Sequence, residues 1–461
     1  PRSDNGYKLY WSNGCQINSP IDSLIEESIR ENQIPWHTNY HKLASFHALR
    51  NVSHLVFDPT DGARDAYLEC VCLKLAVNPI QLNKDSHRVV YTPMHGVGAD
   101  LVSRIFAKAH LPEYIPVVEQ ISPNGDFPTV EYPNPEEGRS ALQLAERTAE
   151  AHNAQVIFCN DPDADRFAVS EKSKNEWRMF NGNEIALMLA RWLWIHRKHI
   201  SGGIELPNSS YSMIASTVSS KALKAMAQIE GFQFHETLTG FKWIAKSAIE
   251  DEQDAQHARC VLLAYEEAIG FMCSTIVRDK DGVSAALVFA ELTADVYARN
   301  LSLSDYLASC YELYGYHVSY NGYLFCRPPS GLKEIFDALR DRGFPLDGFS
   351  GARIDSVRDL TKGTDTQESD GKAVLPSSNS TQFITLRMRS VFSSEADETA
   401  DVVVSLRGSG TEPKVKYYSE IRCSSESAQS NRAYEHLKDL VEAVIEYCLE
   451  PNKNQLERPL S

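Results

Sequence analysis

The sequence predicts an α/β protein, in which successive three-layer α/β/α domains are followed by an α+β C-terminal domain. Two observations predict this fold class. From about residue 86 onward, short apolar runs alternate with amphipathic stretches, which is typical of βαβ units with mostly parallel sheets. In the last third, runs with strand character follow one another directly, and a long helical pattern comes after them. The 461 residues suffice for three or four domains.

The elements of the first two thirds follow from apolar spacing. Strands are expected at 88–92, 115–118, 156–159, 213–215 and 261–264, and helices at 101–109, 136–151, 220–229 and 283–297. Each expected strand is a short apolar run, and each expected helix has apolar residues three or four positions apart. Near the start, the run Leu9-Tyr10-Trp11 also predicts a strand.

The last third has a different pattern. Strands are expected at 383–388, 402–406 and 415–418, and a long helix at 426–449. The segment 361–381, which precedes these strands, is rich in Ser, Thr, Asp and Gly. This composition predicts a long mobile loop without chemistry of its own.

Composition excludes several classes of protein. With 46 basic and 62 acidic residues, the formal net charge is −16, which disfavours a nucleic acid or an anionic membrane as partner. No apolar run reaches the roughly 18 residues of a membrane span, and no secretory signal is recognisable. The ten cysteines include no CxxC pair, so neither zinc nor a redox centre is indicated. We therefore expect a cytoplasmic protein without an obligate protein partner.

An acidic loop follows the apolar run at 156–159. Asp161, Asp163 and Asp165 alternate along it, so their carboxylates can converge on one hard cation such as Mg²⁺. Without a cation these charges would repel one another. An EF-hand fits poorly, because Arg166 and Lys172 stand where that loop has Gly and Glu. A dehalogenase-type phosphatase loop or a solvated acidic turn are the other interpretations.

A second loop, Arg407-Gly-Ser-Gly-Thr-Glu-Pro413, lies between two predicted strands. Small residues let main-chain N–H groups converge, while Ser409 and Thr411 supply hydroxyls and Arg407 a charge, which together suit a phosphate. Lys416 supplies a second cation beyond the loop. A plain Gly-rich hairpin is the alternative.

Two further segments, 239–243 and 265–270, follow strands, where α/β sheets place ligand sites, and each is a weak signal by itself. A third segment, 278–282, opens the next expected helix. The paired carboxylates Glu266 and Glu267 suit sugar hydroxyls or a solvated turn equally well. Lys280 suits a phosphate ligand, a proton carrier or a surface cation.

These loops, in this order, resemble those of the α-D-phosphohexomutase superfamily, and the resemblance covers nearly the whole chain. Residues 161–166 match its metal loop, 239–242 and 266–270 match its sugar-facing loops, and 407–413 match its phosphate loop. The residues of segments 238–244, 265–271 and 279–284 are similar to those of the branch that contains phosphopentomutase and glucose-1,6-bisphosphate synthase. Ala268 replaces a usual Ser and Lys416 a usual Arg, and both departures look typical of that branch.

The resemblance implies four phosphohexomutase domains. Residues 1–55 would be the C-terminal remnant of the first, and 56–180, 181–310 and 311–461 would be the second, third and fourth. The nucleophilic serine of the family would lie before Pro1. We therefore expect the chain alone to be inactive as a mutase.

The resemblance also implies a mechanism, in which a phosphoserine exchanges its phosphoryl group with a sugar phosphate through a bisphosphate, with Mg²⁺ and a sugar bisphosphate activator as cofactors. The implied catalytic residues are Lys8, Arg166 and Lys280, and the metal ligands are Asp161, Asp163 and Asp165. The implied substrate-binding residues are Thr239, Gly240, Lys242, Glu266, Glu267, Arg407, Ser409, Gly410, Thr411 and Lys416. The partners would be small-molecule sugar phosphates. The alternatives are a glucose-1,6-bisphosphate synthase and a non-catalytic phosphosugar-binding protein.

Overall fold

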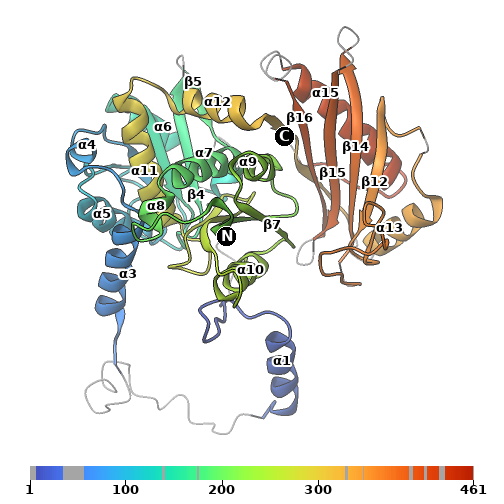
Figure 1. Cartoon of the computed structure of the whole chain (residues 1–461), viewed down its shortest axis with the longest axis horizontal. Helices are drawn as coiled ribbons and strands as arrows, with labels where there is room; N and C mark the ends of the chain where they lie inside the picture. Colours follow the sequence, from blue (N-terminus) through green and yellow to red (C-terminus); the bar gives the residue numbers. More distant parts are fainter. Residues whose placement is uncertain are drawn as a thin grey trace. The chain divides into compact units, whose positions relative to one another are not determined.

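The computed structural model describes most of the chain. The described residues are 7–34, 57–137, 141–173, 176–327, 331–345, 347–379, 381–393, 398–409, 413–424 and 431–459. They form two compact units (Figure 1). The first comprises Pro1–Ile214 and Gly240–Ser304, and the second Ala215–Thr239 and Asp305–Ser461. Within the described ranges, no helix has both the length and the apolar character needed to cross a membrane.

The first unit contains a five-stranded sheet in the order β2-β1-β3-β4-β5. Its strands are β1 (Val90–Thr92), β2 (Ile115–Pro116), β3 (Val156–Asn160), β4 (Phe167–Ser173) and β5 (Glu176–Met179). β1 runs parallel to β2 and β3, whereas β4 is antiparallel to β3 and to β5. The expected mostly parallel sheet is therefore a mixed one. The loop between β3 and β4 is too short for the crossover that a parallel pair needs.

A second sheet has the order β7-β6-β8-β9. Its strands are β6 (Tyr211–Ser216), β7 (Gln233–Thr237), β8 (Cys260–Glu266) and β9 (Gly270–Cys273). β8 and β9 form an antiparallel hairpin, whose turn consists of residues 267–269.

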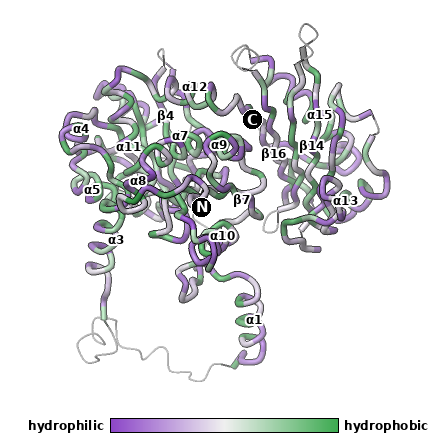
Figure 2. Tube along the Cα trace, viewed as in Figure 1, coloured by the Kyte–Doolittle hydropathy of each residue, from purple (hydrophilic) through white to green (hydrophobic). Residues whose placement is uncertain are grey.

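The helices of this part of the chain vary in length and burial. They are α1 (Ile21–Glu31), α3 (Thr60–Leu75), α4 (Ile80–Lys84), α5 (Gly98–Lys108), α6 (Gln143–Ala151), α7 (Gly182–Ile195), α8 (Arg197–Ile200), α9 (Ala222–Glu230), α10 (Phe241–Gln253), α11 (Gly282–Ala298) and α12 (Leu303–Tyr314), with 3₁₀ turns η2 (Pro135–Glu137) and η4 (Asn208–Ser210). α11 is apolar on nearly all sides, which can be followed in Figure 2, and is buried almost throughout. It packs against β3 and β4 of one sheet and β9 of the other, so its N-terminus lies where the two sheets meet.

The C-terminal unit is built on an antiparallel sheet in the order β10-β16-β15-β14-β12-β13, with β11 also paired to β16. Its strands are β10 (Tyr316–Ser319), β11 (Gly322–Phe325), β12 (Ala352–Asp359), β13 (Thr364–Asp365), β14 (Phe383–Ser393), β15 (Glu398–Gly408) and β16 (Lys414–Cys423). Helices α13 (Gly331–Arg342) and α15 (Arg432–Leu449) bury their apolar residues against this sheet (Figure 1).

Three expectations about local structure were wrong. The helix expected from residue 136 begins at Gln143, because Asn134 accepts a hydrogen bond from the Glu136 N–H and residues 135–137 form a separate 3₁₀ turn. The run at 9–11 forms only a single bridge, Tyr10 to Gln16. The segment at 361–381 is not structureless, because it contains β13 and its Asp365 is 3% exposed.

The contact of Asp365 with Arg387 accounts for the ordered structure within the segment 361–381. The Asp365 carboxylate accepts two hydrogen bonds from the Arg387 guanidinium, at 2.8 and 2.9 Å. This two-point contact anchors the segment to β14. The sequence did not show it, because the partner lies 22 residues away on another strand.

Candidate metal centre

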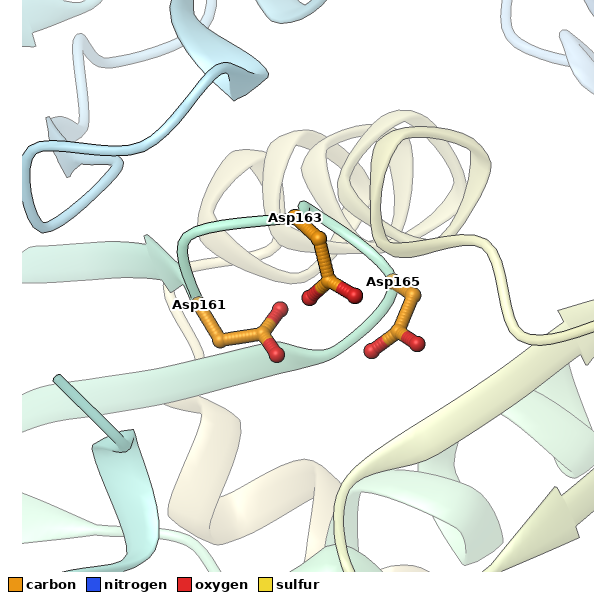
Figure 3. A group of neighbouring side chains, drawn as sticks. All are labelled: Asp161, Asp163 and Asp165. Carbon is orange, nitrogen blue, oxygen red and sulfur yellow. The ribbon is translucent and has the colours of Figure 1, made fainter. Parts of the chain in front are cut away.

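The acidic loop connects β3 to β4 and draws its three aspartates together. One carboxylate oxygen from each of Asp161, Asp163 and Asp165 lies within 4.8 Å of the other two (Figure 3). The loop curves tightly, with Ala164 at φ 58° and its N–H donating to the Asp161 carbonyl at 3.0 Å. Three converging carboxylates form the oxygen donor set that a hard divalent cation such as Mg²⁺ prefers, so the residues fit the expected metal.

The charges of this loop are unevenly compensated. Burial and the neighbouring carboxylates Asp165 and Asp163 raise the pKa of Asp161. Burial acts in the same direction on Asp165, but Lys280 and Lys8 hold its pKa below its usual range. Both lysines thus compensate the charge of Asp165 most closely, and a bound cation would stabilise the ionised form of Asp161.

The three cations predicted to be catalytic all contact this loop. Lys8 Nζ lies 2.9 Å from Asp165 Oδ2, and Lys280 Nζ lies 3.2 Å from the same oxygen. Arg166 Nε lies 3.8 Å from Asp161 Oδ2 and 3.9 Å from Asp165 Oδ1. The structure therefore brings these residues into one charged cluster.

Glu266, at the end of β8, joins this cluster through the hairpin that follows it. Its Oε1 lies 3.7 Å from Lys280 Nζ, and burial raises its pKa although Lys280 opposes the shift. Arg166 and Gly270 form an isolated β-bridge, which holds the hairpin against the acidic loop. A Cβ on Gly270 would lie 2.3 Å from Lys280 Cδ, so a larger residue there would displace the Lys280 side chain. Glu267 follows in the same turn and is half-buried.

Sequence reasoning missed several neighbours of this cluster. Glu136 Oε2 lies 3.7 Å from Arg166 Nη1, and the Tyr10 hydroxyl donates a hydrogen bond to Asp279. Asn160, at the end of β3, is also part of the surroundings. Each of these residues lies in or beside a segment that was predicted from the sequence. Only the contacts in the folded chain place them near the charged cluster.

Lys242 lies beside Asp22 and Trp243. Its Nζ lies 3.9 Å from Asp22 Oδ2 and near the Trp243 ring. Gly240 precedes α10 with φ 100°, and Thr239 is the last residue of its segment in the C-terminal unit. The substrate-binding role of these three residues stays a prediction.

The predicted phosphate loop lies between β15 and β16 of the C-terminal unit. Arg407 is directly opposite Lys416 in the strand register, so both side chains lie on one face of the sheet. The Ser409 N–H donates to the Lys414 carbonyl at 2.9 Å. Gly410 and Thr411 lie outside the described residues.

Comparison with known proteins supports the resemblance. Residues 65–174 match the family model of the phosphoglucomutase/phosphomannomutase α/β/α domain II, and residues 181–314 match that of domain III. Human phosphopentomutase is 40% identical over 99% of this chain and 72% of its own length. Human glucose 1,6-bisphosphate synthase is 41% identical over 99% of this chain and 71% of its own length. A probable phosphoribomutase of Schizosaccharomyces pombe is 37% identical over the whole chain and 74% of its own length.

Solved structures agree on the fold. The open form of a phosphoglucomutase from Paramecium aligns with a TM-score of 0.56 over 86% of this chain and 64% of its own, at 18% identity. A phosphomannomutase fold from Thermus thermophilus aligns with a TM-score of 0.51 over 83% of this chain and 65% of its own, at 16% identity.

Proposed function

The chain belongs to the α-D-phosphohexomutase superfamily, and from this premise we propose that it is a phosphosugar mutase. The reaction would interconvert a sugar 1-phosphate and the corresponding 5- or 6-phosphate, through a phosphoserine and a sugar bisphosphate. The observation that carries the proposal is the convergence of Lys8, Arg166, Lys280 and Glu266 on the acidic loop. Relatives named phosphopentomutase and phosphoribomutase support a pentose phosphate as the substrate.

The acidic loop would hold Mg²⁺ through Asp161, Asp163 and Asp165. Bound there, the ion would neutralise charge on the phosphoryl group that is transferred. Arg166 would add a positive charge on the same side, because its guanidinium lies within 4 Å of two of these carboxylates.

The other residues of the cluster would handle the substrate. Lys8 and Lys280 flank Asp165 and are the candidates for contacts with phosphoryl oxygens and for proton transfer. Glu266 would accept hydrogen bonds from sugar hydroxyls. Arg407 and Lys416 of the C-terminal unit would bind the phosphate that does not react, which uses remote binding energy for orientation.

Turnover of sugar phosphates tests this proposal. We would compare ribose 1-phosphate, deoxyribose 1-phosphate and glucose 1-phosphate in the full-length gene product, with Mg²⁺ and a sugar bisphosphate, by their kcat/KM. Lys280→Met should lower kcat/KM by about 100-fold or more, within the range that a general acid or base contributes. Lys246→Met is the matched control, because Lys246 pairs only with Glu250 on the exposed side of α10 among the described ion pairs. Unchanged turnover of Lys280→Met would refute its role.

A bisphosphate synthase is the second candidate. It is favoured by the relative of that name, which is as similar to the chain as the mutases are. A synthase would use 1,3-bisphosphoglycerate as phosphoryl donor and accumulate the sugar bisphosphate. Comparing that product with the sugar monophosphate isomer in the same assay separates the two activities.

A further inference from the structure

Asn160 is the last residue of β3 and stands immediately before the acidic loop. It is fully buried, at 0% exposure. Its Nδ2 donates to the Arg166 carbonyl at 2.5 Å, and its Oδ1 accepts from the Tyr91 hydroxyl at 2.8 Å. The orientation of the amide follows from chemistry, because a main-chain carbonyl can only accept. One side chain therefore links the residue before the loop, the last residue of the loop and the neighbouring strand β1.

The start of α11 closes the other side of this contact. The Gly282 N–H donates to the Ala164 carbonyl at 3.0 Å. A Cβ on Gly282 would lie 2.3 Å from the Arg166 carbonyl oxygen and 2.4 Å from Asn160 Nδ2. No residue larger than glycine fits at position 282. The Arg166 carbonyl is therefore tightly enclosed, and the Asn160 amide is its hydrogen-bond donor there. Loss of the amide would leave a buried carbonyl and a buried hydroxyl without this hydrogen bond.

We propose that Asn160 is a positioning residue for the divalent cation, an inference that rests on the proposed function of the acidic loop. The aspartates at alternate positions converge only while the loop stays curved, with Ala164 in an unfavourable backbone conformation. The Asn160 hydrogen bond joins the two ends of the loop and maintains that curvature. Groups that orient metal ligands in this way typically change metal affinity by about 10- to 100-fold when they are removed.

The test is the binding of Mn²⁺, which prefers similar oxygen ligands, by electron paramagnetic resonance on the full chain. Asn160→Ala should raise the Kd for Mn²⁺ by about 10-fold or more. Tyr91→Phe removes only the hydroxyl behind the amide and should raise the Kd by a smaller factor. Tyr114→Phe is the matched control, because Tyr114 is a buried neighbour of Tyr91 whose hydroxyl donates to the Ala99 carbonyl instead.

The results distinguish failure of the Asn160 positioning role from failure of the metal site itself. A folded Asn160→Ala that binds Mn²⁺ within twofold of the unmodified chain overturns the positioning role. If Asn160→Ala does not fold, Tyr91→Phe decides: a Kd equal to that of Tyr114→Phe overturns the role, and a raised Kd supports it. If the unmodified chain itself fails to bind Mn²⁺, the metal site of the proposed function is wrong and the positioning role falls with it.

Discussion

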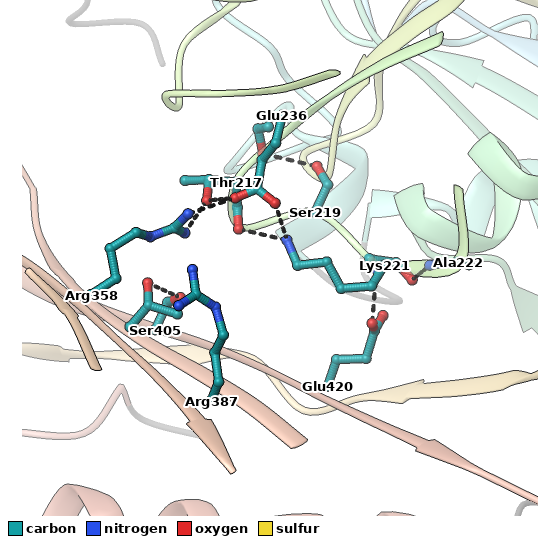
Figure 4. Close-up of polar contacts among 12 residues, drawn as sticks. Thr217, Ser219, Lys221, Ala222, Glu236, Arg358, Arg387, Ser405 and Glu420 are labelled. Atoms are coloured by element: carbon teal, nitrogen blue, oxygen red, sulfur yellow. Dashed lines mark hydrogen bonds and ion pairs between the residues drawn. The ribbon is translucent and has the colours of Figure 1, made fainter. Parts of the chain in front are cut away.

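Replacing Glu236 with glutamine is predicted to destabilise the C-terminal unit by about 3 kcal/mol at neutral pH. Glu236 lies on β7, and its carboxylate meets two cations (Figure 4). Arg358 Nη1 donates to it at 3.0 Å and Lys221 Nζ lies at 3.2 Å, while the Thr217 hydroxyl supplies a further hydrogen bond. Arg358 is 7% exposed, so its charge depends on this partner.

The magnitude follows from the pKa of Glu236. Burial alone would raise this pKa, but Lys221 and Arg358 lower it from 4.5 to about 2. At about 1.4 kcal/mol per pH unit, this difference corresponds to about 3 kcal/mol. Because the pKa is lower in the folded state, the stabilisation is fully present above pH 4.5 and is lost as the pH falls toward 2.

Urea unfolding followed by circular dichroism measures this effect. The unmodified chain should lose stability steeply between pH 4.5 and 2, and Glu236→Gln should show a shallower dependence over the same range. Glu450→Gln is the control, because Glu450 also meets two cations, Arg342 at 2.8 Å and Lys453 at 2.9 Å, but both of these partners are more exposed than Arg358. A loss below about 1 kcal/mol for Glu236→Gln, comparable to that of an exposed pair, would refute the reasoning.

Three further changes have defined outcomes. Glu171→Ala removes the buried carboxylate that accepts from two main-chain N–H groups at the start of α12, at 2.6 and 3.0 Å, so urea unfolding should show a loss of about 2–3 kcal/mol. Gly282→Ala places a methyl group 2.3 Å from the Arg166 carbonyl and should weaken Mn²⁺ binding, whereas Gly62→Ala, with open space around it, should not. Asp163→Asn removes one of three clustered carboxylates and should abolish most of the rise in melting temperature that Mn²⁺ produces; an undiminished rise would argue against the site.

Local patterns in the chain predicted much of the fold. Apolar spacing identified the strands around β1, β3, β8 and β15 and the helix α11, because burial on one or all faces leaves a periodic signal. The acidic loop was also predicted from its sequence, since its three carboxylates lie within five residues and converge through local backbone curvature. Membership of the superfamily followed from such short segments in their order.

The partners of that loop depend on packing between distant segments. Lys8 reaches Asp165 across 157 residues, and Glu266 contacts Lys280 beside the bridge between Arg166 and Gly270. The mixed pairing of the first sheet and the two-point contact of Asp365 likewise arise from strands meeting in three dimensions. Periodicity reports which face of an element is buried, but not which element covers it. For this reason Asn160, which directly follows the predicted strand, was connected with the acidic loop only when Tyr91 and the end of the loop were placed on either side of its amide.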